Sequence, residues 1–266
     1  MNKGISFYFG FVTNPEERAK MIKDAGFDCV ITSYDKKFDC QNGTLASQMK
    51  LFKKYGLKVS SLHMSYNEED LPYFFLKGLK GYLLERRLIK DVKLAKKYGF
   101  NCVVVHLGGR PSKVGVDRLK KVLNVCHETN IPLAIENLQY NDTFFAIFKQ
   151  IDDPYLKFCW DVGHSHFASN DFDFIKEYGD KLIALHLHDN DGTSDMHTLN
   201  KYGTNDWRKI AKSLASLDRD INLDYEVLMV YRQNETASEV ATTVYNQACE
   251  LDKMIEEERA KLHKKA

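Results

Sequence analysis

One unit recurs along the chain and restricts its possible folds more than any other feature. In each copy a Lys-containing amphipathic segment ends in glycine, at Gly26, Gly56 or Gly99, and a short apolar run follows. Glycine readily adopts the left-handed conformation just past a helix C-terminus, and Lys in the last turn suits the negative end of the helix dipole. A short, nearly unbroken apolar run is typical of a parallel strand covered on both faces. The unit is therefore a helix followed by a buried strand.

Eight strand candidates emerge when this pattern is followed along the chain. They span residues 4–9, 29–32, 59–63, 102–106, 133–136, 158–161, 183–188 and 223–226. Helical patterns lie between most of them, at residues 14–25, 44–55, 82–98, 118–129, 206–217 and 237–262. Alternating strands and helices predict a parallel sheet, and eight repeats favour a closed barrel over an open sheet. No G-x-G-x-x-G motif follows the first strand, which argues against a dinucleotide-binding fold.

Length and composition agree with this α/β prediction. The chain has 266 residues, and a (β/α)₈ TIM barrel typically has about 250. No linker or low-complexity stretch divides the chain, so we expect a single domain over residues 1–266. Hydrophobic residues make up 44% and charged residues 28%, as in an ordinary globular protein.

Charge and cysteine content limit the classes of partner and compartment. Lys plus Arg number 38 and Asp plus Glu number 37, so the chain has no overall attraction to nucleic acid or to an anionic membrane. The six cysteines are scattered without a C-x-x-C pair, and Cys29, Cys102 and Cys159 lie in strand-like runs. We expect reduced core thiols in a cytoplasmic protein, with no signal peptide and no membrane-spanning segment.

Side chains able to bind a metal ion end six consecutive predicted strands. The ends of parallel strands converge at one rim of a barrel, where such enzymes place their active sites. A single His or Asp after a strand is as readily a helix cap or a hydrogen-bonded histidine. So many at one rim would repel one another and be costly to desolvate, and a divalent cation removes that cost. The residues concerned are His63, His106, Glu136, Asp161, His186 with His188, and Glu226.

The residue types restrict the metal without choosing it. Imidazoles and carboxylates, with no obvious Cys ligand, suit zinc, manganese, cobalt or iron(II), with magnesium also open, and suit calcium less well. A segment rich in Gly, Asp and Ser follows His188 and reads as a loop. Within it Asp195 and His197 are candidates for further ligands, although a plain surface loop would have the same composition.

Several short motifs carry a resemblance to a known superfamily. They are Ile135-Glu136-Asn137, Asp161-Val162-Gly163-His164, Leu185-His186-Leu187-His188-Asp189-Asn190, Asp195-Met196-His197, Gly203 with Asp206-Trp207, and Tyr225-Glu226. In this order the chain resembles the xylose isomerase-like TIM barrels, which include sugar phosphate isomerases/epimerases and endonuclease IV-type AP endonucleases. One departure is the absence of a Pro-Gly-x-Gly stretch after His197, which puts the shape of that loop in doubt.

The resemblance implies a ligand set. Glu136, Asp161, His186 and Glu226 would form the principal metal site. Five other residues match the remaining ligands of the trinuclear zinc site of endonuclease IV, namely His63, His106, His164, Asp195 and His197.

Our first hypothesis is a metal-dependent isomerase or epimerase of a sugar, sugar phosphate or cyclitol, with a dehydratase of the same family also open. Its chemistry removes a proton next to a carbonyl and stabilises the resulting enediolate with the metal. We expect Glu136 and Glu226 to act as the acid/base pair, and His164 and His188 to contact substrate hydroxyls. Weaker candidates for the substrate pocket are Phe7, Phe9, Phe11, Tyr66, Trp207 and Arg232, each of which has an equally plain structural or solvent-exposed explanation.

Two other hypotheses remain. The first is zinc-dependent cleavage of abasic DNA, which needs a basic track for the duplex backbone. The basic pairs Arg86-Arg87 and Lys120-Lys121 fall on predicted outer helices, away from the rim, so nucleic acid is not the expected partner. The second is a non-catalytic barrel that scaffolds a partner, against which the intact ligand set argues. A homodimer is expected only by analogy with other barrels.

Overall fold

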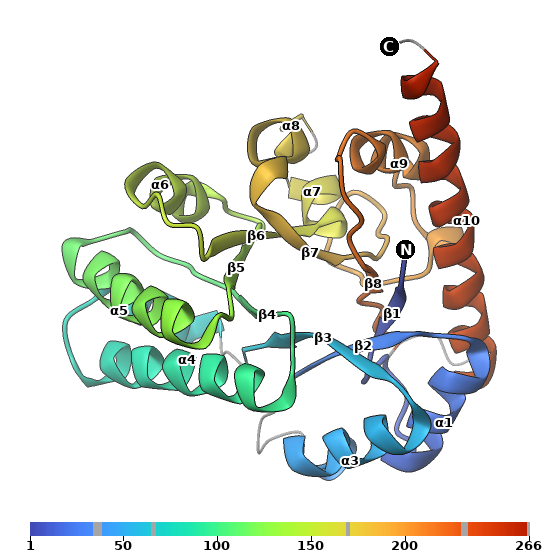
Figure 1. Cartoon of the computed structure of the whole chain (residues 1–266), viewed down its shortest axis with the longest axis horizontal. Coiled ribbons are helices and arrows are strands. Elements are labelled where there is room, and N and C mark those ends of the chain that lie inside the picture. The colour runs from blue at the N-terminus through green and yellow to red at the C-terminus, as the bar shows by residue number, and fades with distance from the viewer. Residues whose placement is uncertain (34–38, 65–67, 169–170, 230–233, 265–266) are drawn as a thin grey trace.

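The eight strands form one parallel sheet that curls into a barrel (Figure 1). The computed structural model describes residues 1–33, 39–64, 68–168, 171–229 and 234–264. Neighbouring strands follow one another in sequence order, and β1 pairs with both β2 and β8. The strands are β1 (Lys3–Ser6), β2 (Cys29–Ser33), β3 (Lys58–His63), β4 (Cys102–Val105), β5 (Leu133–Glu136), β6 (Leu156–Asp161), β7 (Leu182–His186) and β8 (Leu223–Tyr225).

A parallel bridge between Leu187 and Tyr225 joins the two ends of the sheet. The Leu187 N–H donates to the Asp224 carbonyl, and the Glu226 N–H donates to the Leu187 carbonyl, both at 2.9 Å. Because these bonds lie just beyond the end of β7, the barrel closes at the rim that holds the predicted ligands. The predicted (β/α)₈ barrel is thereby confirmed.

Helices surround the strands (Figure 1). Gly26, Gly56 and Gly99 end three of them with φ of 111°, 65° and 80°, which confirms the meaning of the recurrent sequence unit. The helices are α1 (Pro15–Ala25), α2 (Asp39–Asn42), α3 (Leu45–Tyr55), α4 (Leu79–Tyr98), α5 (Lys113–Thr129), α6 (Asp142–Gln150), α7 (Val162–Ala168), α8 (Phe174–Tyr178), α9 (Trp207–Ala215) and α10 (Ala237–His263).

Several element boundaries differ from the prediction. Helices α2, α6, α7 and α8 are absent from the prediction. Helix α6 has only 9 residues, fewer than the window of about 11–18 in which a helical period can be recognised. Strand β1 ends at Ser6, and β7 ends at His186, so His188 lies beyond the strand to which it was assigned.

Small side chains fill the barrel interior directly beneath the predicted ligands. Cys102, Val104, Ala134, Cys159 and Ala184 form a separate buried cluster. Alternate residues of a strand point to the same side, so a ligand stands two residues beyond each small one. This holds for Val104 and His106, for Ala134 and Glu136, for Cys159 and Asp161, and for Ala184 and His186. The small layer leaves room for long polar side chains at the barrel mouth.

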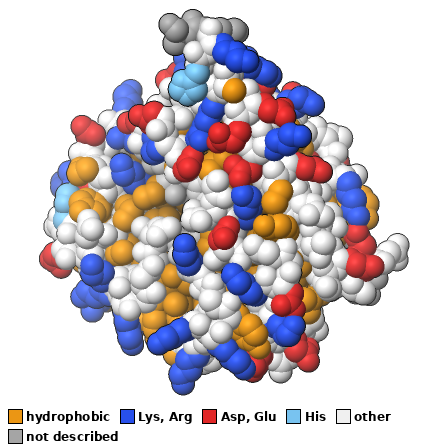
Figure 2. All heavy atoms as spheres, turned by 45° about the vertical axis from the view of Figure 1, so that its right-hand side comes forward, with side chains coloured by type: hydrophobic (Ala, Val, Ile, Leu, Met, Phe, Trp, Pro, Cys, Tyr) orange, Lys and Arg blue, Asp and Glu red, His pale blue; other side chains and the backbone are white. Residues whose placement is uncertain are grey.

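The outer surface mixes both signs of charge. Basic and acidic side chains are interspersed over the face shown in Figure 2, so this face presents no field of a single sign. Cys29, Cys102, Cys126 and Cys159 are free and buried, as predicted for the three of them that lie in strands. Within the described ranges, every helix is too short or too polar to span a bilayer.

Candidate metal centre

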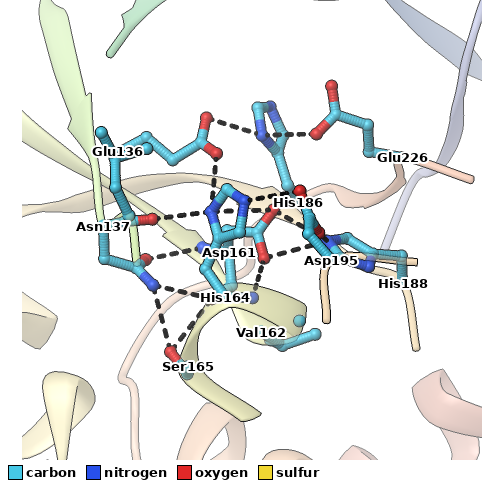
Figure 3. A network of polar contacts seen from close by, with 12 residues as sticks. Glu136, Asn137, Asp161, Val162, His164, Ser165, His186, His188, Asp195 and Glu226 are labelled. Atoms are coloured by element: carbon cyan, nitrogen blue, oxygen red, sulfur yellow. Dashed lines mark hydrogen bonds and ion pairs between the residues drawn. The ribbon is translucent and has the colours of Figure 1, made fainter. Parts of the chain in front are cut away.

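Four side chains from four parts of the barrel converge at its mouth (Figure 3). One potential ligand atom from each lies within 4.8 Å of the others. Three of the four residues are buried, and the fourth is partly exposed. The set is Glu136 at the end of β5, Asp161 at the end of β6, His186 at the end of β7 and Glu226 just after β8. This is the principal site implied by the resemblance.

His186 lies between the two glutamates. Its Nδ1 is 2.9 Å from Glu136 Oε2 and 3.1 Å from Glu226 Oε2. Burial opposes ionisation of Glu136, but the charges of His106 and His186 overcome it and hold the pKa of that carboxyl well below its usual value. Burial likewise opposes ionisation of Glu226, whose pKa is nevertheless lowered, chiefly by the charge of His186. Both carboxylates are therefore ionised at neutral pH.

A second group of ligand atoms shares Glu136. His63 Nε2 and His106 Nε2 lie 3.3 Å apart, and they lie 3.4 and 3.1 Å from the two carboxylate oxygens of Glu136. All three ligand atoms fall within 4.8 Å of one another. Glu136 would therefore be able to help hold an ion in either of the two groups.

A third group combines His164 of α7 with Asp195 and His197 of the loop after β7. Asp195 Oδ2 is 3.2 Å from His164 Nε2 and 3.1 Å from His197 Nε2. His197 has φ of 45°, a left-handed conformation that costs energy for any side chain other than glycine. Burial alone would lower the pKa of His197, but its hydrogen bond with Asp195 raises that pKa to about 9. The loop therefore holds His197 in a strained backbone conformation in which its imidazole contacts the Asp195 carboxylate.

Backbone carbonyls set the orientation of three of the histidines. The Nδ1 atoms of His63, His164 and His197 lie 2.9, 2.9 and 2.8 Å from the carbonyl oxygens of residues 64, 137 and 226. A carbonyl only accepts, so each Nδ1 carries the proton. In the neutral ring Nε2 then carries the lone pair, and this atom lies against Glu136 in His63 and against Asp195 in His164 and His197. Metal-binding histidines are commonly oriented in this way.

The cluster leaves buried polar atoms without hydrogen-bond partners. Both carboxylate oxygens of Glu136 and both ring nitrogens of His186 are buried and form no hydrogen bond of regular geometry. Unsatisfied buried groups are costly, and a bound cation would satisfy them. The donor set therefore fits a divalent metal ion. Contrary to the sequence-based view that no Cys belongs to the set, Cys159 also falls within 4.8 Å of Glu136 and His186.

A buried network holds Asp161 in place (Figure 3). Asn137 accepts from the Asp161 N–H at 2.8 Å and donates to its carbonyl at 2.9 Å. His188 Nε2 lies 3.1 Å from both Asp161 carboxylate oxygens, and its ring stacks on His197 with centroids 3.9 Å apart. A Cβ on Gly163 would lie 1.9 Å from the His188 ring, so only glycine fits there.

A cavity of about 460 Å³ opens above the cluster. Seven of the predicted site residues line it, namely His63, His106, Glu136, His164, Asp195, His197 and Glu226. His188 is outside this lining, so the structure places it behind Asp161 rather than at the position expected for a substrate contact. Among the expected aromatic residues Phe7 lines the cavity.

Other weak candidates lie elsewhere. Trp207 Nε1 donates to Asp189 at 2.7 Å and stays outside the cavity lining. Phe9 and Phe11 are also outside that lining. Tyr66 and Arg232 fall outside the described residues. Sequence reasoning missed Tyr8, Ser33 and Asn42, which also line the cavity, because none of them is a residue type that commonly binds a metal ion.

The fold and the site together define a (β/α)₈ barrel with a His/carboxylate cluster at the C-terminal ends of its strands. The family model described as "Xylose isomerase-like TIM barrel" matches residues 19–243. The chain therefore belongs to the xylose isomerase-like TIM barrel family.

Two sequence relatives illustrate the match. An uncharacterised protein of Sinorhizobium fredii is 31% identical over 111 residues, which is 39% of this chain and 36% of that protein. The chain thus matches little more than a third of this relative's length. An uncharacterised protein of Methanocaldococcus jannaschii is 24% identical over 210 residues, covering 74% of this chain and 79% of that protein.

Solved structures share the whole fold. A D-tagatose 3-epimerase-like protein superposes with a TM-score of 0.78 at 18% identity, covering 97% of this chain and 99% of the other. A D-psicose 3-epimerase studied with D-fructose gives 0.73 at 14% identity, with 96% and 99% covered. The 3-keto-D-glucoside 4-epimerase YcjR from E. coli gives 0.70 at 15% identity, with 94% and 99% covered. At these identities the likeness concerns the fold.

Proposed function

We propose that the protein is a divalent-metal-dependent isomerase or epimerase of a sugar or cyclitol. The observation that carries this proposal is the pair of ionised glutamates on either side of His186 Nδ1, at 2.9 and 3.1 Å, at the base of the cavity. The named activities of the fold neighbours, D-tagatose and D-psicose 3-epimerases and a 3-keto-D-glucoside 4-epimerase, agree with it. Fold likeness alone would not decide function.

Glu136, Asp161, His186 and Glu226 would hold the principal ion, with zinc, manganese, cobalt and magnesium all compatible with this mixture of oxygen and nitrogen ligands. A divalent ion bound there would polarise a substrate carbonyl and stabilise negative charge on its oxygen. The third group, His164, Asp195 and His197, would hold a further ion or, without one, contact substrate hydroxyls.

Glu136 and Glu226 would move the proton. Both line the cavity, and both have lowered pKa values, so each is ready to accept a proton at neutral pH. They come from β5 and from the segment after β8. One ionised carboxylate can therefore remove a proton from the carbon next to a carbonyl. The other, after taking up a proton from solvent, can return it to the opposite face, and the first carboxylate then releases its proton to solvent. Such an exchange inverts the configuration at that carbon.

Solvent exchange tests this chemistry before the product is known. Protein stripped with a chelator and reloaded with manganese, cobalt, magnesium or zinc would be incubated in D₂O with D-fructose, D-tagatose, D-psicose or a 3-keto-glucoside. We expect deuterium to enter next to the carbonyl with at least one pair of metal and substrate, as seen by NMR. If every combination shows neither exchange nor an epimer, while the metal is bound, the proposal fails for these substrate classes.

One observation keeps a second function open. The three ligand groups together match the complete trinuclear set that the resemblance implies for endonuclease IV-like zinc phosphodiesterases. Against it, the described part of the cavity wall contains neither Lys nor Arg, whereas binding a duplex requires cationic contacts to phosphates. Incubating zinc-loaded protein with an abasic duplex decides between the two. Strand nicking at catalytic enzyme concentration would favour the nuclease.

Location and assembly belong to the same proposal. Free buried thiols support a cytoplasmic protein, because reduced cysteines persist there. A homodimer is proposed by analogy alone, and sedimentation of the metal-loaded protein would test it.

A further inference from the structure

The cavity is also lined by polar side chains that are outside the groups of potential metal ligands. They form a wall built from β1, β2 and α2, and this wall contributes Ser6, Tyr8, Thr32, Ser33 and Asn42 to the lining. Asn42 is 7% exposed. A polar side chain this deeply buried normally has all its hydrogen bonds satisfied, so the partners of its amide indicate what this wall can bind.

Arg18 determines which way the Asn42 amide faces. The Arg18 side chain is fully buried, and its Nη1 donates to Asn42 Oδ1 at 2.8 Å. A guanidinium has donors only, so the amide oxygen must face Arg18 and the amide nitrogen must face away from it. Within the described part of the chain, Asn42 Nδ2 donates to no protein acceptor, although the residue lines the cavity. The wall therefore presents an amide donor without a protein partner.

Bonds on both sides of Asn42 hold this arrangement rigid. Arg18 Nη2 donates to the Phe11 carbonyl at 2.9 Å, and Nη1 also lies 3.2 Å from the Gln41 carbonyl. On the other side, Gln48 Nε2 donates to the Gly43 carbonyl at 3.0 Å and its Oε1 accepts from Thr32 at 2.6 Å. The donor is thus fixed before any ligand arrives, which lowers the entropic cost of binding.

We propose that this wall is a substrate subsite in which Asn42 donates to an oxygen of the sugar remote from the reacting carbon, with Arg18 as the positioning residue. The proposal rests on the proposed isomerase or epimerase function and specifies its substrate. The substrate must carry a hydroxyl or carbonyl oxygen at the end that reaches the Asn42 amide. A sugar that lacks this oxygen leaves a buried donor unpaired, which is how sites of this kind reject analogues.

Deoxy analogues identify the oxygen concerned. Metal-loaded protein would be titrated calorimetrically with D-fructose, D-tagatose and D-psicose, and with the monodeoxy forms of the ketose that binds most tightly. For wild-type protein we expect one deoxy position to lower affinity about tenfold or more. In Asn42→Ala that penalty should disappear, because the donor that discriminates is gone. If removing the sugar hydroxyl lowers affinity equally in wild-type protein and in Asn42→Ala, the two changes act independently and the proposal is wrong.

Two further variants separate binding from damage to the fold. Asn42→Ser retains an oxygen for Arg18 but is too short to donate across the cavity, so it should lose the deoxy penalty while its thermal midpoint stays near that of wild type. Arg18→Lys keeps the positive charge but cannot hold both Asn42 and the Phe11 carbonyl with one planar group. It should reduce the deoxy penalty although Asn42 is present. A full penalty in a folded Arg18→Lys variant would exclude Arg18 as the positioning residue.

The outcomes distinguish this inference from the proposed function. Suppose that wild-type protein binds a ketose and exchanges deuterium, and that both Asn42 variants show the same loss of affinity for the deoxy ketose as wild type does. In that case only the subsite proposal is wrong. If wild-type protein binds no ketose and exchanges no deuterium, the subsite proposal is wrong and the proposed function fails for these substrate classes.

Discussion

His63 Nε2 and His106 Nε2 face each other at 3.3 Å. The His63 Nδ1 proton is committed to the Met64 carbonyl at 2.9 Å, so Nε2 of the neutral ring is a lone pair. Glu136 lies 3.1 Å from His106 Nε2. Two imidazole nitrogens and a carboxylate oxygen in this arrangement need a shared proton or a cation, and a metal ion can meet that need.

The first prediction concerns the number of bound ions. Replacing His106 by Asn should remove the ion shared by His63, His106 and Glu136 and leave the principal ion in place. We expect the zinc content of dialysed protein to fall by one equivalent, measured by elemental analysis. His127→Asn is the matched control, because His127 is an exposed residue that bonds to Asp153, packs beside Tyr155 and belongs to none of the ligand groups found among the described residues. Unchanged zinc content in the His106 variant would exclude this ion position.

The second prediction concerns Glu136, which belongs to both ligand groups. Glu136→Gln keeps the shape but removes the charge, so we expect metal affinity to fall by about 100-fold or more, beyond the range typical for loss of an outer-shell partner. Deuterium exchange into substrate should become undetectable. Glu128→Gln, on the exposed face of α5, should bind metal as wild type does. Full exchange activity in Glu136→Gln would show that another group moves the proton.

The third prediction concerns the pH dependence of stability without metal. Despite burial, Asp195 and neighbouring acids raise the pKa of His197 to about 9, and Asp161, Asp195 and Glu136 raise that of His164 to about 12. An unfolded histidine titrates near 6.5, so above that pH the folded protein binds more protons than the unfolded chain. The stabilisation is therefore complete below about pH 6.5 and declines as pH rises through 9.

Urea unfolding of chelator-treated protein at pH 6.5 and pH 9 measures this decline. The midpoint should be lower at pH 9, and Asp195→Asn should reduce the difference because it removes the charge that favours the imidazolium forms. Metal-loaded protein should also show a smaller difference, since bound histidines carry no proton on the ligating nitrogen. A midpoint that rises with pH in the metal-free protein would contradict the assignment.

The fourth prediction concerns Gly163 in α7. Alanine normally stabilises a helix relative to glycine by about 1 kcal/mol, but here its Cβ would lie 1.9 Å from the His188 ring. We expect Gly163→Ala to destabilise the protein by about 1–3 kcal/mol and to weaken metal binding by displacing His188 from Asp161. In the control Gly108→Ala the new Cβ would be 3.3 Å from Leu71, so its effect should be smaller. Equal effects of the two substitutions would speak against a tight fit at Gly163.

The fifth prediction concerns Trp207. Its Nε1 donates at 2.7 Å to Asp189, a fully buried carboxylate that also accepts from the backbone of Asn190 and Asn205. Trp207→Phe should cost about 1–3 kcal/mol in urea unfolding, because it leaves a buried charged acceptor short of a donor. In the comparison variant Trp160→Phe the lost partner is the neutral Ser165 hydroxyl, 2.9 Å away, so the loss should be smaller. A large change in substrate affinity without loss of stability would instead make Trp207 a substrate contact.

The barrel and the place of its ligands could be predicted because both follow from local patterns. A helix that ends in glycine, followed by an apolar strand, indicates one repeat of the barrel. The last residue of each parallel strand then lies at the C-terminal rim of the barrel. The end residues Glu136 and Asp161 were located in this way. The layer of small residues beneath them, such as Ala134 and Cys159, is a further signal that could have strengthened the assignment.

Other parts of the site depended on contacts between distant segments. The sequence marked His188 as a ligand or a substrate contact, yet its ring lies behind Asp161, because β7 ends two residues earlier and the loop that carries His197 covers it. Helix α6 was missed because its 9 residues are fewer than the window of about 11–18 in which a helical period can be recognised.

The sequence by itself determined which residues lie at the strand ends. The apolar run of a strand and the glycine that ends the preceding helix are local properties of the chain. Only the tertiary structure decided how those residues are used. The nitrogen that each imidazole directs at the cluster, and the orientation that Arg18 imposes on Asn42, depend on hydrogen-bond partners far away in sequence. Such partners are chosen by strand register and loop packing, which no local pattern specifies.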